Sequence, residues 1–281
     1  MGLQKVSTML MEADKKGTAV IAFNTMNYEG IAWLIDVAEE EQIPVIQMFY
    51  PALKNYIPFE VFASTVKQLA AKVEIPIGLH LDHSRSYDEI LQAIKVGFTS
   101  VMFDGSALPY EENIRITSKV VEAAHAMGVD VEAELGLVGL ASKVEDFTNA
   151  DLFTKPAEAK EFIERTGVDY LAIAIGSAHG NYKTVPKLDL ERLKEIDNVI
   201  DTPLVLHGGT GIPNEQLIKA FKLGINKLNV GTELFQLFYA KTKEIIDIGT
   251  SKTDYNYIDL MTHLKTAMKE YYCTKIQIMR V

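Results

Sequence analysis

Short runs of apolar and β-branched residues recur along the chain, and each is followed by a longer segment in which apolar residues return every three or four positions. Runs that are apolar throughout are typical of strands buried on both faces, whereas the three-to-four spacing indicates amphipathic helices. We therefore predict eight strands, at residues 18–24, 44–49, 75–83, 99–104, 129–135, 168–176, 203–207 and 226–230.

Helices are predicted between these strands and at both ends of the chain, at residues 3–16, 29–41, 59–72, 87–96, 111–127, 156–166, 188–196, 214–221, 233–248 and 257–272. Eight strand–helix units with no break in composition predict an α/β fold: one (β/α)8 TIM-barrel domain over residues 1–281, with an N-terminal helix and an extra C-terminal helix. A doubly wound open sheet is the alternative. It would more often carry a G-x-G-x-x-G turn after the first strand, which TAVIAFNTMNYEG lacks.

Charge and cysteine content narrow the class of protein. Lys and Arg total 28 against 38 Asp and Glu, a net charge of −10. An acidic chain is a poor candidate for binding nucleic acid or an anionic membrane, although a local basic pocket for a phosphate ester stays open. Cys273 is the only cysteine, which excludes a disulfide framework and a paired-cysteine zinc site. The sequence has no run of about 18 apolar residues and no leader pattern, so we expect a cytoplasmic protein.

Polar side chains gather where the predicted strands end, which is where TIM barrels carry their chemistry. These residues are Asn24, Asp82, His83, Asp104, Glu132, Glu134, His179, His207 and Asn229. His83, His179 and His207 follow the third, sixth and seventh strands, which a closed barrel brings around one mouth. Three neutral imidazoles with an open position form a known type of catalytic zinc site. The alternative is that each histidine caps its strand or bonds locally.

Carboxylates accompany the histidines. Asp82 directly precedes His83, and neighbouring side chains on a strand point to opposite faces, so the two share a site only if the strand has already turned. Otherwise Asp82 would cap the next helix. Glu132 and Glu134 share a strand face, and a buried carboxylate needs a metal, a cation or backbone donors. A buried salt bridge with a lysine such as Lys183 is the alternative to a metal.

Glycine-bearing turns follow the last three strands, with the sequences HGNYK at 179–183, HGGTG at 207–211 and NVGTE at 229–233. A phosphate group commonly lies on the loops after the last strands of this fold, held by backbone N–H groups near helix starts. Glycine permits the close approach, and Lys183 would add a positive charge. The alternative is that these are simply tight turns, and Asp104 in FDGS fits a turn equally well.

Taken together, these segments resemble the class II, zinc-dependent ketose-bisphosphate aldolases, in particular the tagatose- and fructose-bisphosphate aldolase branch. The resemblance spans nearly the whole chain and rests on GLHLDHSRS, FDGSALPYEEN, VEAELG, GVDYLAIAIGSAHGNYK, TPLVLHGGTGIP and KLNVGTE. It implies a lyase of carbohydrate metabolism, such as glycolysis. Such an enzyme reversibly cleaves a ketose 1,6-bisphosphate to dihydroxyacetone phosphate and an aldehyde through an enediolate. The resemblance also implies Zn²⁺, a monovalent cation (Na⁺ or K⁺), a small phosphorylated sugar as substrate, and a homodimer or homotetramer.

The resemblance implies roles residue by residue. Asp82 would be the catalytic proton donor, His83, His179 and His207 would bind zinc, and Asp104 and Glu134 match a second or alternative metal site. The substrate-binding residues would be Asn24, Gly180, Lys183, Gly208, Gly209, Thr210, Asn229, Gly231 and Thr232.

The sequence departs from the family pattern where the proton-abstracting base is expected. The family continues ELG-x-x-GG-x-E, whereas this chain has Leu140 at the second glycine and Ser142 at the acidic position. We therefore expect Glu145, or else Asp146, to act as the base. After the second strand, residues 49–51 (FYP) replace the serine and glycine that are usual in the family.

Other functions stay open alongside the leading one. The altered loop also fits an aldolase of the same family with a different aldehyde partner, or a repurposed paralogue that binds metal and phosphate without full turnover. A lysine Schiff-base aldolase on the same fold would use Lys183 or Lys227, but neither lies in an obviously apolar segment that would depress its pKa.

Overall fold

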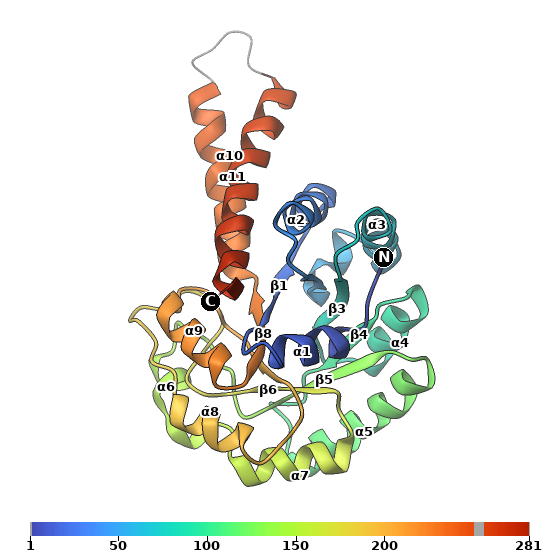
Figure 1. The fold of residues 1–281 in the computed structure, drawn as a ribbon, viewed down its shortest axis with the longest axis vertical. Helices are drawn as coiled ribbons and strands as arrows, with labels where there is room; N and C mark the ends of the chain where they lie inside the picture. Colours follow the sequence, from blue (N-terminus) through green and yellow to red (C-terminus); the bar gives the residue numbers. More distant parts are fainter. Residues whose placement is uncertain (1, 250–255, 281) are drawn as a thin grey trace.

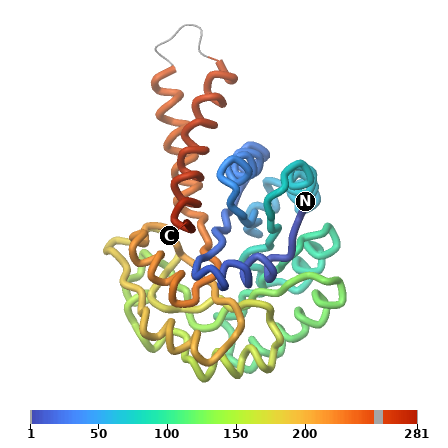
Figure 2. Tube along the Cα trace, viewed as in Figure 1, coloured from blue at the N-terminus to red at the C-terminus, as the bar shows by residue number. Residues whose placement is uncertain are grey.

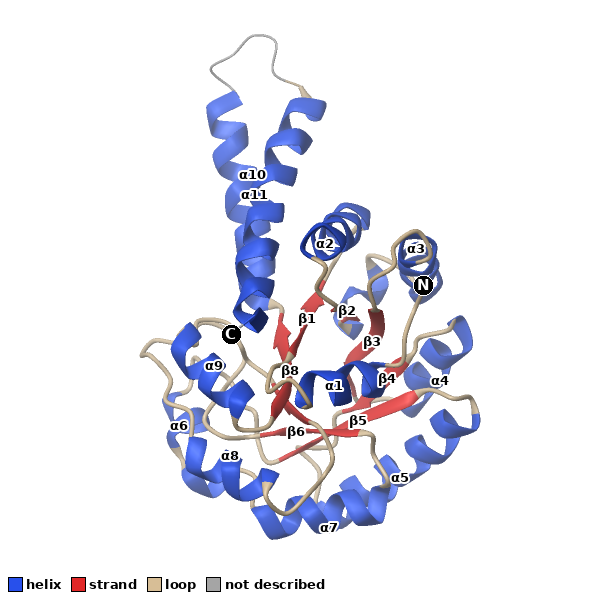
Figure 3. Cartoon of the chain, in the orientation of Figure 1, coloured by secondary structure: helices blue, strands red, loops and turns tan. Residues whose placement is uncertain are grey.

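Eight parallel strands close on one another in chain order in the computed structural model, which describes residues 2–249 and 256–280. β1 pairs with both β2 and β8, so the sheet has no free edge. The barrel lies at the centre of Figure 3 and confirms the predicted TIM-barrel fold. Its strands are β1 (Val20–Asn24), β2 (Val45–Phe49), β3 (Ile77–Ser84), β4 (Ser100–Phe103), β5 (Asp130–Leu135), β6 (Tyr170–Ile173), β7 (Leu204–Leu206) and β8 (Ile225–Val230).

Helices surround the barrel, and each predicted helix is present. They are α2 (Tyr28–Glu41), α3 (Phe59–Ala70), α4 (Tyr87–Val96), α5 (Tyr110–Ala126), α7 (Pro156–Thr166), α8 (Leu190–Asp197), α9 (Asn214–Lys222) and α10 (Thr232–Gly249), with α1 (Val6–Asp14) and α11 (Tyr257–Gln277) at the ends of the chain. Capping explains several boundaries: Asn27 accepts a hydrogen bond from Gly30 N at the start of α2, and Gly97 takes a left-handed φ of 91° after α4.

Four short helical turns fall in segments that we predicted as loop: α6 (Val144–Thr148), η1 (Pro51–Asn55), η2 (Ala150–Leu152) and η3 (Ile278–Arg280). They are too short for a periodic apolar pattern to reveal them. No helix within the described ranges 2–249 and 256–280 has the length and apolar character required to span a membrane.

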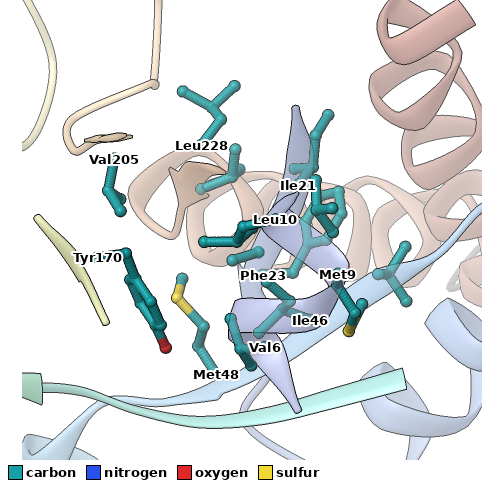
Figure 4. Close-up of a cluster of buried hydrophobic side chains, with 14 of the residues drawn as sticks. Val6, Met9, Leu10, Ile21, Phe23, Ile46, Met48, Tyr170, Val205 and Leu228 are labelled. Carbon is teal, nitrogen blue, oxygen red and sulfur yellow. The ribbon is translucent and has the colours of Figure 1, made fainter. Parts of the chain in front are cut away.

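The helix α1 closes the end of the barrel at which the strands begin, and Figure 1 shows it lying across that end. Ser7 N donates a hydrogen bond to Asp130 Oδ2, at the start of β5, over 2.8 Å. Val6, Met9 and Leu10 are buried on the barrel side of α1, together with side chains from the strands (Figure 4). The opposite end, where the strands finish, is therefore left to form the mouth of the barrel.

The helices α10 and α11 form an antiparallel pair that projects from the barrel, which we call the arm (Figures 1 and 2). The base of the arm is anchored on α2, because Lys265 pairs with Asp36 at 3.2 Å and Tyr272 is buried. The arm exposes large apolar side chains, namely Tyr239, Ile246, Ile248, Tyr257 and Ile258.

Candidate active site

The end of β3 delivers two adjacent side chains to the mouth of the barrel. His83 has a left-handed backbone with a φ of 50°, and the pairing of β3 with β4 shifts register between Leu81 and Ser84. This bulge breaks the alternation that would place Asp82 and His83 on opposite faces. The strand has thus turned, as sharing a site required, and Asp82 Oδ1 lies 3.9 Å from His83 Nε2.

Three imidazoles and one carboxylate converge beside this bulge. The donor atoms of His83, Glu134, His179 and His207 all lie within 4.8 Å of one another. Nε2 of His83 and Nδ1 of His207 face each other at 2.8 Å, and Glu134 Oε2 lies 3.4 Å from the same Nδ1. The resemblance assigned Glu134 to a second metal position, whereas the structure groups it with the three histidines.

The four donors fit a zinc ion. Imidazole nitrogens and carboxylate oxygens are the ligands that catalytic zinc takes when cysteine is absent. Glu134 Oε2 is buried and makes no hydrogen bond to any residue in the described part of the chain. A buried polar atom without a partner is destabilising, and a cation among the imidazoles would satisfy it.

The pKa values of the clustered side chains are shifted in different directions. Burial, together with the neighbouring imidazoles, lowers the pKa of His179 to about 3, and burial also lowers the pKa of His207 well below its usual value. Burial acts on His83 in the same sense, but nearby carboxylates, first of all Asp82, outweigh it and raise the pKa of His83 to about 9. Burial raises the pKa of Glu134 to about 8. At neutral pH, His83 and Glu134 therefore hold the protons that a metal would displace.

A buried ion pair lies deeper in the barrel, behind His207. Glu132 Oε1 lies 2.7 Å from His207 Nε2, while Glu132 Oε2 accepts from Lys227 Nζ at 2.7 Å. The sequence left open a salt bridge with a lysine such as Lys183. Lys227 has that place instead, because Lys183 is exposed after β6 while Lys227 reaches the interior from β8. An ammonium group held in this pair is also a poor Schiff-base nucleophile.

A second carboxylate lies behind His83, near the rim of the mouth. Asp104 Oδ2 is 3.4 Å from His83 Nδ1 and accepts from Arg85 Nε and Nη2 at 3.0 and 2.9 Å. Asp104 Oδ1 accepts from Ser106 Oγ at 2.7 Å. Burial opposes the ionisation of Asp104, but these hydrogen bonds, led by that with His83, hold its pKa well below the usual range. Nothing in the spacing of the sequence indicates that Arg85 joins this group.

Two amides fix the carboxylate of Asp82. Asn24 Nδ2 donates to Asp82 Oδ2 at 2.8 Å, and Asn229 Nδ2 donates to Asp82 Oδ1 at 2.9 Å. The resemblance implied that both asparagines bind substrate. In the structure they orient Asp82, and the Oδ1 atom of each is buried with no hydrogen-bond partner among the described residues. Each asparagine therefore has one acceptor that no described residue satisfies.

The glycine-bearing turns after β6, β7 and β8 form another part of the mouth. The Tyr182 hydroxyl accepts from Ala178 N at 2.6 Å and donates to Gly208 O at 3.1 Å, which ties the first turn to the second. A Cβ on Gly208, whose φ is 67°, would lie 2.3 Å from Ala178 O, so this turn requires glycine. α10 begins at Thr232, so the N–H groups of a helix start lie in the third turn. The remaining predicted residues of these turns are Gly180, Lys183, Gly209, Thr210 and Gly231.

The loop at 136–149 packs against a candidate metal ligand. Ala141 N donates to His179 O at 2.9 Å, next to a short β-bridge between Leu140 and His179. Asp146 Oδ2 accepts from Leu140 N at 2.9 Å, so this carboxylate anchors the loop. Glu145 is exposed on α6. Of the two carboxylates expected as the base, Asp146 is thus committed to the loop structure.

A family profile and a curated relative each match most of the chain. The sequence matches the family profile described as fructose-bisphosphate aldolase class-II over residues 4–281. It is 43% identical over 250 residues to a fructose-bisphosphate aldolase of Geobacillus stearothermophilus, a match that covers 88% of this chain and 86% of that one.

Solved structures agree with the sequence matches. The crystal structure of the YdjI aldolase from Escherichia coli K12 superposes with a TM-score of 0.87 at 36% identity, over 99% of this chain and 97% of that chain. The fructose-bisphosphate aldolase (Fba) from Campylobacter jejuni superposes with a TM-score of 0.83 at 21% identity, over 99% and 96% of the two chains, which is a likeness of fold alone. The profile match and the identity to a curated relative both extend over most of the chain, so the protein is a lyase with aldolase chemistry and belongs to the class-II fructose-bisphosphate aldolase family.

Proposed function

We propose that the chain is a zinc-dependent aldolase that reversibly cleaves a ketose 1,6-bisphosphate, of the fructose or tagatose type, to dihydroxyacetone phosphate and an aldehyde. The convergence of three histidines and Glu134 beside Asp82 carries the proposal. When bound, zinc would supply Lewis acidity toward the substrate oxygens and so make a neighbouring carbon-bound proton acidic. The names of the relatives support fructose bisphosphate as one substrate.

The side chains around the cluster divide the remaining work. Asp82 would give a proton to the new hydroxyl oxygen in condensation and take it back in cleavage. Asn24 and Asn229 hold each oxygen of Asp82 in a fixed direction, so the proton is handled at a defined place in the mouth. Asp104 is engaged with His83 and Arg85, which makes it a partner of a metal ligand in addition to its proposed place in a second metal site.

The phosphate of the donor half would lie on the three glycine-bearing turns. Backbone N–H groups at the start of α10 and in the HGG turn suit an oxyanion, and the exposed Lys183 would add a charge. A monovalent cation beside this phosphate belongs to the same proposal, and replacing Na⁺ and K⁺ by a bulky organic cation in the assay tests it.

Glu145 is the proposed proton-abstracting base. It is exposed, whereas Asp146 holds Leu140 N, so the two carboxylates give a matched pair of variants. Glu145→Gln should abolish exchange of the carbon-bound proton of dihydroxyacetone phosphate while the loop stays in place. Exchange that survives in Glu145→Gln and is lost in Asp146→Asn would assign the base to Asp146.

The deciding experiment follows cleavage of fructose and tagatose 1,6-bisphosphates, and exchange of the donor's proton, with and without a chelator. His207→Ala should lose zinc and activity together. Asp82→Ala should keep zinc and lose cleavage by about 10²–10⁴-fold. Full activity after zinc removal would contradict the proposal. Exchange without cleavage of either sugar would instead identify an aldolase with another aldehyde partner, and zinc binding with neither would identify a binding paralogue.

We further propose that the arm joins copies of this chain into a homodimer or homotetramer. Its exposed side chains, Tyr257 and Ile258 among them, form an apolar surface that a second copy would cover. Ile258→Glu should shift the protein toward the monomer in analytical ultracentrifugation, and a monomeric wild-type protein would refute the assembly.

A further inference from the structure

We propose that Glu132 is a positioning residue that sets the tautomer of His207. We further propose that, because Lys227 occupies one oxygen of Glu132, only a carboxylate at position 132 can do so, and an amide cannot. The inference rests on the proposed zinc site, because the nitrogen that Glu132 leaves unprotonated is the one that faces the cluster. It concerns two residues outside the four-donor cluster, and the side chains of both Glu132 and Lys227 are 0% exposed.

The first step is the hydrogen bond at His207. An ionised carboxylate can only accept, so the 2.7 Å contact between Glu132 Oε1 and His207 Nε2 places the ring proton on Nε2. Asn229 Nδ2 also lies 3.2 Å from Nε2, and its NH₂ group has a second N–H beyond the one that it donates to Asp82, but the shorter contact with the carboxylate decides where the ring proton lies. Nδ1 is therefore left with its lone pair, 2.8 Å from His83 Nε2 and inside the four-donor cluster.

The second step is the hydrogen bond from Lys227 to Glu132. An ammonium group has donors only, and Lys227 Nζ takes the other oxygen, Glu132 Oε2, at 2.7 Å. Glu132 thus serves these two donors on two separate oxygens within the barrel, and the buried His80 Nε2 lies 3.4 Å from Oε2, on the same side as Lys227. A carboxylate offers an acceptor at both positions, whereas an amide offers an acceptor at one position and a donor at the other.

Glu132→Gln is therefore a predicted tautomer switch. Lys227 would hold the amide oxygen, which turns the NH₂ group toward His207 Nε2. That nitrogen must then accept, so the ring proton moves to Nδ1 and blocks the metal-facing position. Outer partners of this kind typically change metal affinity by about 10–100-fold, and we expect a loss in that range.

Lys227→Met in the same chain should reverse the switch. Without the ammonium group, the amide that Glu132→Gln introduces is free to rotate and present its oxygen to His207. The Glu132→Gln/Lys227→Met protein should hence regain the Nε2–H tautomer and most of the zinc affinity. Lys227→Met alone keeps the carboxylate and should keep the Nε2–H tautomer. Two residues with a merely structural role would give a double variant at least as impaired as Glu132→Gln.

The experiment measures the tautomer of His207 by long-range ¹H–¹⁵N NMR on metal-free full-length protein, and zinc affinity by competition with a chromophoric chelator. The His207 signal is assigned with a His207→Asn variant. Tyr170→Phe is the control: it removes a hydroxyl that contacts Ser100 in the same interior, and it should leave the His207 tautomer unchanged.

The expected result is Nε2–H in the wild type, Nδ1–H with about 10–100-fold weaker zinc binding in Glu132→Gln, and recovery of both in the double variant. A wild-type protein with the proton on Nδ1 overturns the inference even if no variant folds. So does a Glu132→Gln protein with an unchanged tautomer, or a double variant without recovery. A wild type that shows Nε2–H and binds no zinc would refute the proposed function alone, because the tautomer is measured without metal.

Discussion

Two of the clustered histidines are each backed by a carboxylate that is itself paired with a cation, and the two arrangements differ in depth. Behind His207, both Glu132 and Lys227 are completely buried. Behind His83, Asp104 is buried but the side chain of Arg85 is 72% exposed. The two cations also bind differently: Lys227 and His207 use separate oxygens of Glu132, whereas Arg85 and His83 share Oδ2 of Asp104.

The difference in depth predicts that the Glu132–Lys227 pair contributes more to stability than the Asp104–Arg85 pair. Charges held in the interior are screened by salt much less than exposed charges, and removing one partner leaves the other uncompensated. In the pair at the rim the cation is exposed to water, so its loss should matter less. We therefore expect equivalent substitutions in the two pairs to have very different effects.

The largest effect should come from Lys227→Met. It leaves the Glu132 carboxylate buried without its cation, and we expect the free energy of unfolding to fall by about 3–5 kcal/mol in urea titrations. Adding Glu132→Gln should return part of this stability because the uncompensated charge is removed. A change of less than about 1 kcal/mol in Lys227→Met would mean that the interior pair behaves like a surface pair.

Acidification should weaken zinc binding because His83 and Glu134 take up protons. The pKa of His83 is raised to about 9 and that of Glu134 to about 8, so protons compete with the metal at both groups below pH 8. His207, whose pKa is lowered, is already neutral and adds no competition. Affinity should rise with pH up to about 9, and each displaced proton should contribute about tenfold per pH unit. Calorimetry in buffers of different ionisation enthalpy counts the released protons, and no release at pH 7 would contradict this assignment.

Asp104→Asn should have a smaller effect than Glu132→Gln, although both replace a carboxylate by an amide. One amide oxygen at the Oδ2 position can still accept from both Arg85 and His83, and the Ser106 hydroxyl can turn to accept from the new NH₂ group. The only acceptor lost is the one for Ser106 N, a long contact of 3.3 Å to Oδ1. Chelator competition should show a loss of zinc affinity of less than about tenfold, below the range for outer-partner mutations. Equal losses in Asp104→Asn and Glu132→Gln would show that charge, and not the number of acceptor positions, decides.

The smallest effect is expected for Arg85→Met. Its side chain is exposed, and Asp104 keeps its hydrogen bond from the Ser106 hydroxyl and its contact with His83, so the free energy of unfolding should change by less than about 1 kcal/mol. The difference should shrink further as salt is added. Urea titrations at low and high ionic strength measure both quantities. A salt-independent loss comparable to that of Lys227→Met would place Arg85 with the buried support.

The strand–helix order, the closed barrel and the positions of the three histidines at strand ends followed from the sequence, because apolar runs and helical spacing are written directly in it. The simultaneous approach of Asp82 and His83 to the mouth did not follow. It depends on a single left-handed residue, His83, inside a strand, and the alternation rule has no means to anticipate that bulge.

The lysine that pairs with Glu132 inside the barrel could not be predicted from the sequence either. Glu132 lies on the same strand face as Glu134, which suggested a buried partner, but the choice between Lys183 and Lys227 required knowing which lysine faces inward. A search for inward positions on β8 two residues before Asn229 would have found Lys227. Glu145 is exposed whereas Asp146 binds Leu140 N, and this difference between adjacent residues of one short helix likewise depends on how the loop folds back on Leu140.

The helix α10 connects the third glycine-bearing turn of the mouth to the arm. It starts in the third glycine-bearing turn, directly after Gly231, where a Cβ would come within 3.2 Å of Asn24 Nδ2. Its 18 residues span about 27 Å without a proline, so it is a stiff strut from the rim outward into the arm. A contact that holds the far end of α10 in place would restrain the backbone next to Asn24. Because Asn24 binds Asp82, the same contact would restrain the orientation of the Asp82 carboxylate.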